Sequence, residues 1–219
     1  MSAASPLILG HRGLSSKHLE NSMEAFRAAL AAGMAGFELD VQPTRDGVCV
    51  VLHDEDLART ANGSGHLRQM KAAELPALKN GEPLPRLADA LELPAKLINV
   101  ELKGEPGWQQ ALATVEAAEA LGRVLFSSFE PSEVLQLWAA CETARCGFLW
   151  ETDEALALTA EELADLPEAL WFHPPLKAVK ANPGLWAPYA QRLALWGMKT
   201  PAEAKDLPFT PAVLIVDGL

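Results

Sequence analysis

The chain has 219 residues, of which 49% are hydrophobic and 21% charged, a composition typical of globular proteins and not of disordered or fibrous ones. It contains 18 Lys and Arg against 29 Asp and Glu, which gives a formal net charge of −11 at pH 7. This acidity disfavours a broad surface for nucleic acid or anionic membranes. A small phosphate could still bind where a few cations or a metal ion converge in one cleft.

The three cysteines lack CxxC spacing, so neither a disulfide framework nor a zinc site is indicated, and a reducing compartment is expected. Near the N-terminus the apolar run at 7–10 is too short for a signal-peptide core. No apolar stretch approaches the roughly 18 residues that a membrane-spanning helix needs. We therefore expect a cytoplasmic protein without a membrane span.

Short apolar runs alternate along the chain with longer segments of helical period, a pattern that predicts βαβ units and a parallel sheet. Eight such strands favour a closed (β/α)8 TIM barrel. Because no repeat or linker interrupts the pattern, residues 1–219 are expected to form a single domain. Helices are expected at 22–32, 109–121, 132–140 and 154–164. Strands are expected at 7–10, 36–41, 97–102, 124–127, 144–149, 169–172, 192–196 and 212–216.

Two features interrupt the regular alternation. After the second strand, TRDG at 44–47 predicts a turn into a short antiparallel arm, and the polar, proline-containing stretch at 54–85 is interpreted as an insertion. Insertions at this point lie on the C-terminal face of a barrel, where active sites are built. At the other end, the chain stops at Leu219 and leaves no room for a helix after the last strand. The exposed flank would be covered by neighbouring segments or by a second molecule in a homodimer.

Ionisable residues stand at the ends of the expected strands, although strands buried on both faces should be apolar. Glu38 and Asp40 are two residues apart and so point to the same face, as do Glu101 and Lys103. Three crowded carboxylates repel one another unless a cation neutralises them, and an all-oxygen set suits Mg²⁺ or Ca²⁺. The alternative is a set of solvated strand ends paired with Lys or Arg.

Two histidines follow neighbouring strands and could act as general base and general acid. His11 comes after the first strand and His53 after the antiparallel arm, which suits proton transfer on opposite sides of a phosphorus centre. Arg12 and Lys103 could balance the charge of a phosphodiester. The alternatives are hydrogen-bonded structural histidines and simple pairing of the two cations with neighbouring acids.

Several segments form an ordered pattern: HRG (11–13), LENS (19–22), FELDVQPTRDGVCVVLHD (37–54), LARTANGSG (57–65) and NVELK (99–103). Later stretches extend it more loosely, namely SSFEP (127–131), HPP (173–175), Trp196 and LIVDG (214–218). In this order and spacing they resemble the glycerophosphodiester phosphodiesterases over nearly the whole chain. The resemblance implies a TIM barrel with an inserted subdomain, and a metal-dependent hydrolase of lipid and glycerol metabolism that releases glycerol 3-phosphate and an alcohol.

The resemblance also implies roles for individual residues. It makes His11 and His53 catalytic and places the phosphate against Arg12 and Lys103. The implied ligands of a Mg²⁺ or Ca²⁺ ion are Glu38, Asp40 and Glu101.

Three further residues have two interpretations each. Glu20 and Asn21 match a pair beside the metal site, but they also precede Ser22, where a helix N-cap is expected. Trp196 matches an aromatic wall of the glycerol pocket, whereas an isolated tryptophan is more often a core residue. The sequence does not indicate which histidine is the base, nor whether water or the glycerol 2-hydroxyl attacks.

Some positions depart from the family pattern. Leu19 replaces the usual proline, Ser22 the usual threonine, and GMKT after Trp196 replaces a Thr-Val-Asn run, which leaves the shape of the alcohol-side pocket open. His18 and His66 match no role and are expected in exposed loops.

Two other functions are alternatives to this one. A phospholipase D-like activity on lysophospholipids would need an apolar lip, whereas the insertion at 54–85 is polar and lacks aromatic residues. A non-catalytic binding barrel would not need a matched acid and base. In each case the partner is a small molecule and not a nucleic acid.

Overall fold

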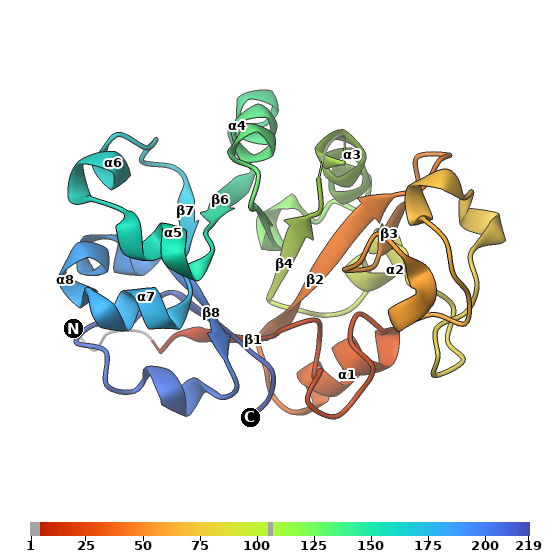
Figure 1. The fold of residues 1–219 in the computed structure, drawn as a ribbon, viewed down its shortest axis with the longest axis horizontal. Coiled ribbons are helices and arrows are strands. Elements are labelled where there is room, and N and C mark those ends of the chain that lie inside the picture. Colours follow the sequence, from red (N-terminus) through yellow and green to blue (C-terminus); the bar gives the residue numbers. More distant parts are fainter. Residues whose placement is uncertain (1–4, 105–106) are drawn as a thin grey trace.

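Eight parallel strands form a ring in the order β7-β6-β5-β4-β2-β1-β9-β8 in the computed structural model, which describes residues 5–104 and 107–219 (Figure 1). Isolated parallel bridges from Phe172 to Leu193 and from Pro175 to Trp196 link the β7 and β8 sides and nearly close the ring. The predicted TIM barrel is confirmed. The strands are β1 Leu7–Gly10, β2 Gly36–Pro43, β4 Leu97–Leu102, β5 Val124–Ser128, β6 Arg145–Leu149, β7 Trp171–His173, β8 Ala194–Met198 and β9 Val213–Val216.

Helices surround the ring and connect its strands (Figure 1). The α-helices are α1 Met23–Ala31, α2 Leu87–Leu91, α3 Trp108–Ala117, α4 Pro131–Ala140, α5 Thr152–Ala157, α6 Ala160–Ala164, α7 Leu176–Ala181 and α8 Pro183–Trp186. Short 3₁₀ helices are η1 Leu57–Arg59, η2 Leu67–Gln69, η3 Ala72–Glu74, η4 Leu121–Arg123, η5 Ala187–Arg192 and η6 Pro201–Ala204.

The single helix predicted over 154–164 is wrong, because the chain forms two short helices there. Leu158 is extended, and the side chain of Thr159 accepts a hydrogen bond from the backbone N–H of Glu162. A threonine in this position starts a new helix and so ends the preceding one. The apolar period continues across the break, which is why the pattern suggested one helix.

Apolar side chains fill both sides of the strands. The larger cluster lies between the strands and the helices and includes Phe26 of α1 stacked on Phe37 of β2, with ring centroids 4.4 Å apart. A smaller cluster fills the barrel interior with residues two apart on their strands, such as Val213 and Ile215. The interior is therefore packed below the C-terminal mouth, and only the mouth is left for chemistry.

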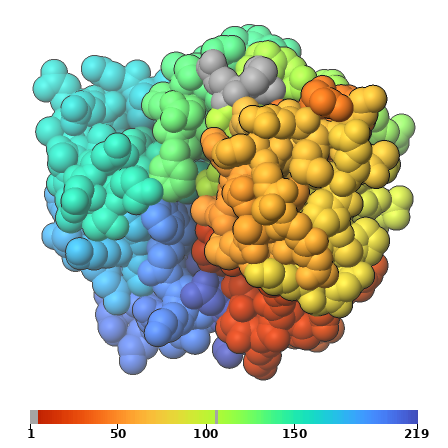
Figure 2. All heavy atoms as spheres, turned by 45° about the vertical axis from the view of Figure 1, so that its right-hand side comes forward, coloured from red at the N-terminus to blue at the C-terminus, as the bar shows by residue number. Residues whose placement is uncertain are grey.

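The predicted arm and insertion are both present. β3 (Cys49–Val51) pairs antiparallel with β2, and residues 54–85 form a small apolar cluster with Val50 and Leu52 that includes Leu57, Leu67 and Leu78. Figure 2 shows this insertion, in orange and yellow, lying against the red N-terminal part of the chain. The insertion therefore packs beside β3 and the N-terminal part of the chain.

The structure also places the two loop histidines and the segment before β9. His66 is exposed as predicted, but His18 is half-buried, with its Nδ1 3.0 Å from Oε1 of Glu24. Leu207 and Phe209, which precede β9, pack against the larger apolar cluster. None of the helices within residues 5–104 and 107–219 is long and apolar enough to cross a membrane.

Candidate active site

Three carboxylates converge at the barrel mouth because of the register between β2 and β4. Asp40 pairs directly with Glu101, and Glu38 pairs with Asn99. Since side chains alternate along a strand, Glu38, Asp40 and Glu101 all point inward. Oxygens of the three lie within 4.8 Å of one another, and the residues are 3%, 0% and 8% exposed.

The burial and mutual repulsion of these acids disfavour their ionised forms. Burial and the negative charge of Asp40 raise the pKa of Glu38 to about 8, and the same two causes raise the pKa of Glu101 to about 8. Oε1 of Glu38 has no hydrogen-bond partner among the described residues. An all-oxygen, negatively charged and buried set of this kind fits a hard divalent cation such as Mg²⁺ or Ca²⁺.

Two cations of the chain already lie against the carboxylates. Nζ of Lys103 is 3.1 Å from Oδ1 of Asp40 and also forms an ion pair with Glu101. Nε of Arg12 is 3.3 Å from Oδ2 of Asp40. The pairing with acids that the sequence left as an alternative is therefore present. It compensates part of the negative charge and leaves both cations in the wall of the cavity described below.

The turn after β1 aims its backbone at the carboxylates. Arg12 has a φ of 53°, a left-handed conformation that is uncommon for a residue with a side chain, and its N–H donates to Oε2 of Glu38 at 2.8 Å. Gly13 follows with a φ of 83°, and a β-carbon there would lie 2.6 Å from the backbone of Ala25. Glycine is therefore required at this close approach of the turn to α1.

Glu20 and Asn21 contact the site and do not cap the helix. Nδ2 of Asn21 donates to Oδ2 of Asp40 at 2.8 Å, and Oε1 of Glu20 accepts from Nη1 of Arg12 at 2.8 Å. The helix cap is Ser22, whose side chain accepts from a backbone N–H of α1. Of the two interpretations, the cap therefore belongs to Ser22 alone, and Glu20 and Asn21 instead contact Arg12 and Asp40.

Each candidate catalytic histidine is held by an aspartate. Nδ1 of His11 lies 2.9 Å from Oδ1 of Asp217, and Nδ1 of His53 lies 2.7 Å from Oδ1 of Asp54. Asp54 also accepts hydrogen bonds from the guanidinium of Arg59, which lower its pKa to about 2. With Nδ1 occupied in both rings, Nε2 is the atom of each histidine left for proton transfer.

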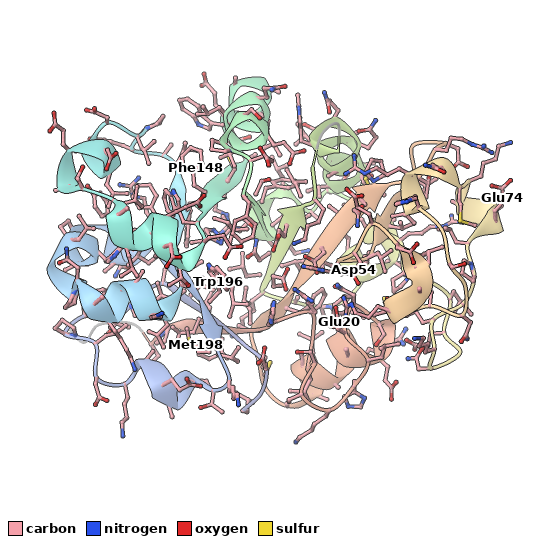
Figure 3. All side chains as sticks on the ribbon, viewed as in Figure 1. Glu20, Asp54, Glu74, Phe148, Trp196 and Met198 are labelled. Carbon is pink, nitrogen blue, oxygen red and sulfur yellow. The ribbon has the colours of Figure 1, made fainter. Side chains whose placement is uncertain are left out.

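Both histidines, both cations and the carboxylates of Glu38 and Glu101 line one cavity of about 280 Å³. The rings of Phe129 and Trp196 meet edge to face in its wall, with centroids 6.0 Å apart. In Figure 3, Asp54 and Glu20 lie on one side of the barrel centre and Trp196 on the other. The cavity is lined by His11, Arg12, Glu38, His53, Asn99, Glu101, Lys103, Phe129, Leu149, Glu151, Trp196 and Ile215.

Three residues that orient the histidines, directly or through a neighbour, had no role predicted from the sequence. Asp54 is the neighbour of His53, and Arg59 lies in a segment that carries the resemblance, so the sequence held a signal for both. Asp217 is 206 positions from His11. Only the closure of the ring, which places β9 beside β1, brings that pair together.

The fold and the site together define a TIM-barrel protein with an acidic, two-histidine mouth. The model of the Glycerophosphoryl diester phosphodiesterase family matches residues 11–205. The chain belongs to this family. A glycerophosphodiester phosphodiesterase from Caldanaerobacter subterraneus subsp. tengcongensis is 32% identical over 162 residues, which are 66% of this chain and 67% of that protein. One from Bacillus altitudinis is 37% identical over 143 residues, 56% of this chain and 57% of that protein.

Solved structures agree on the fold. A glycerophosphodiester phosphodiesterase from Thermotoga maritima matches with a TM-score of 0.79 and 27% identity, over 98% of this chain and 96% of that one. A phosphodiesterase from Oleispira antarctica, solved with the product sn-glycerol-3-phosphate, also has a TM-score of 0.79, at 23% identity over 97% and 93% of the two chains.

Proposed function

We propose that this protein hydrolyses glycerophosphodiesters to glycerol 3-phosphate and an alcohol, with Mg²⁺ or Ca²⁺ held by Glu38, Asp40 and Glu101. The observation that carries the proposal is one cavity lined by two buried carboxylates, two cations and two aspartate-bound histidines, with an oxygen of the buried Asp40 within 4.8 Å of oxygens of those two carboxylates. The names of the relatives support the reaction type. The glycerol 3-phosphate bound by the Oleispira antarctica protein supports the product.

A bound divalent ion would supply Lewis-acid polarisation of a phosphate oxygen. The residues of the chain do the rest of the binding. Arg12 presents a planar guanidinium and Lys103 a compact ammonium to the anionic phosphate, and both line the cavity. Trp196 is fixed by a hydrogen bond of 2.9 Å from its Nε1 to the carbonyl of His173, so its ring forms a rigid wall for the glycerol carbons.

Proton transfer is assigned to the two histidines. Nε2 of His11 removes a proton from the attacking oxygen, which belongs either to water or to the glycerol 2-hydroxyl. Nε2 of His53 gives a proton to the alcohol oxygen as its bond to phosphorus breaks. If the 2-hydroxyl attacks, the product of this step is a cyclic phosphate, which water opens in a second step with the histidine roles reversed.

The rival functions gain no support from the site. The exposed face of the insertion is polar, and its large apolar residues Leu57, Leu67 and Leu78 are buried in the cluster that it shares with the antiparallel arm. It therefore offers no apolar lip for the acyl chain of a lysophospholipid. A binding barrel would not need aspartates that fix the rings of two histidines.

Release of glycerol 3-phosphate from glycerophosphoethanolamine, measured with and without EDTA, tests the proposed reaction. We expect steady release that EDTA abolishes and that added Mg²⁺ or Ca²⁺ restores. Absence of release with either ion would contradict the reaction. Full activity after exhaustive EDTA dialysis, with no metal found by elemental analysis, would contradict the metal requirement and leave the reaction in place.

Asp217→Asn should lower kcat by about 10- to 100-fold with little change in KM, because an amide cannot hold the His11 ring in the same tautomer and orientation. Asp217→Glu should keep more of the activity, since it retains the charge. Asp206→Asn, an exposed aspartate before β9, serves as the control. An Asp217→Asn protein with the kcat of the wild type would show that this contact does not position His11.

The single domain, the homodimer and the cytoplasmic location stay predictions. Analytical ultracentrifugation at micromolar concentration tests the homodimer, and a strict monomer would rule it out.

A further inference from the structure

Arg59 has no role in the reaction described so far, although it lies at the centre of the contacts beside the cavity. It ends η1 in the insertion, and 46% of its side chain is exposed. It does not line the cavity that holds the catalytic groups. An ion pair of an exposed arginine usually contributes little to stability. The guanidinium of Arg59, however, binds a carboxylate on each of two sides.

One side of the guanidinium holds Asp54. Nε of Arg59 donates to Oδ2 of Asp54, and Nη2 lies 3.1 Å from Oδ1. The same Oδ1 contacts Nδ1 of His53 at 2.7 Å. Arg59 therefore fixes the carboxylate that in turn orients the histidine.

The other side holds Glu20, which lies 39 positions away in the chain. Nη1 of Arg59 donates to Oε2 of Glu20 at 2.7 Å, and Nη2 donates to Oε1 at 2.8 Å. Oε1 of Glu20 also accepts from Arg12 at 2.8 Å, and Arg12 in turn lies 3.3 Å from Asp40. A continuous chain of charged contacts thus runs from His53 through Arg59 to the phosphate-facing arginine.

The chemistry of these contacts suits arginine and not lysine. A guanidinium has five N–H donors in a rigid plane and can bind two carboxylates at once, whereas an ammonium is a single point charge. Despite partial burial, the hydrogen bonds from Arg59 and the charge of Arg12 lower the pKa of Glu20 to about 2. Both carboxylates therefore remain ionised partners of Arg59 at neutral pH.

A second contact holds the insertion against the N-terminal part of the chain and provides a comparison. Nη1 of Arg27, in α1, lies 3.8 Å from Glu82 of the insertion, and Glu82 also accepts from the N–H of Glu24. This contact docks the insertion on α1 itself, whereas Glu20 lies in the loop before α1, and it involves none of the residues around the cavity. The two docking points can thus be broken separately.

We propose that Arg59 is a positioning residue that holds His53 and Arg12 in a common geometry, so that proton donation and phosphate binding stay aligned. The proposal rests on the proposed phosphodiesterase function. It predicts that loss of Arg59 acts on His53 and Arg12. Neither is adjacent to Arg59 in the chain, and Arg59 contacts them only through the carboxylates of Asp54 and Glu20.

Arg59→Ala should lower kcat on glycerophosphoethanolamine by about 10- to 100-fold, since small displacements of catalytic groups have effects of this size. Arg59→Lys should restore less than about a tenth of the kcat that Arg59→Ala loses, because lysine cannot bind both carboxylates. Added guanidinium should restore part of the activity of Arg59→Ala and none of Arg59→Lys. In a His53→Ala background, the same Arg59→Ala change should cost much less, because coupled residues are not additive.

Arg27→Ala is the matched control and should keep the kcat of the wild type. An Arg59→Ala protein with unchanged kcat and pH profile would overturn the proposal, as would full additivity with His53→Ala. Equal losses in Arg27→Ala and Arg59→Ala would also overturn it, since docking of the insertion alone would then explain the effect.

An observation that needs no turnover separates this proposal from the proposed function. In ring-proton NMR spectra, Arg59→Ala should shift or broaden the Nδ1 proton signal of His53 and leave that of His11 unchanged. If the wild type were inactive on every diester but this change appeared, the positioning role would stand and the reaction would fail. An unchanged His53 signal would overturn the positioning role whatever the activity.

Discussion

Replacing either histidine of the cavity with alanine should lower kcat by about 10²–10⁴-fold, the range that general acid–base catalysis contributes. Both rings are only partly buried, with side-chain exposures of 34% for His11 and 33% for His53. Their removal therefore leaves no large cavity, and folding should survive. The loss should appear mainly in kcat because neither histidine is needed to bind the phosphate charge.

Leaving-group chemistry distinguishes the roles of the two histidines. Nitrophenolate leaves a diester without being protonated. A nitrophenyl diester should therefore partly restore the activity of the variant that lost the general acid, and not that of the variant that lost the general base. We expect the rescue in His53→Ala. His66→Ala, which removes an exposed histidine of the insertion, is the control. If circular dichroism shows a folded His11→Ala or His53→Ala protein with wild-type turnover, that histidine has no part in catalysis.

Glu38→Gln should raise the concentration of Mg²⁺ or Ca²⁺ needed for half-maximal activity by at least about tenfold, because it removes one charged oxygen ligand without changing the shape of the side chain. Thermal unfolding gives a second measure. A ligand that binds only the folded state raises the Tm, so Ca²⁺ should raise the Tm of the wild type more than that of the variant.

The matched control for this experiment is Glu92→Gln, which changes an exposed glutamate at the end of α2. It should respond to the metal as the wild type does. A Glu38→Gln protein with an unchanged metal requirement and an unchanged Tm response would contradict the assignment of Glu38 as a ligand.

Much of the fold follows from local patterns in the sequence. Apolar runs marked all eight strands of the ring to within a few residues, and the two-residue spacing of Glu38 and Asp40 predicted that they share a face. The register that sets Asp40 against Glu101 could not be predicted in this way, because it depends on how two strands separated by the whole insertion pair.

Long-range contacts account for what the sequence did not show. The pairing of His11 with Asp217 requires the ring to close, and the contact between Arg59 and Glu20 requires the insertion to dock on the loop before α1. The break in the helix predicted over 154–164 has a local cause, the cap at Thr159. A capping residue inside an apolar period is a signal that could have been used.

The register between β2 and β4 also bears on how the chain avoids misfolding. If β2 slipped by one residue, Glu38 and Asp40 would turn outward into the apolar layer under the helices, and Phe37 and Leu39 would enter the mouth. Each buried, unpaired charge would cost several kcal/mol there. Gly36 adds a steric constraint, because a β-carbon at this position would collide with the carbonyl oxygen of Leu97. The acids of the candidate metal site thus destabilise barrels in which β2 is shifted by one residue. Substitutions that remove these charges would also reduce the energy difference between the native and the shifted register.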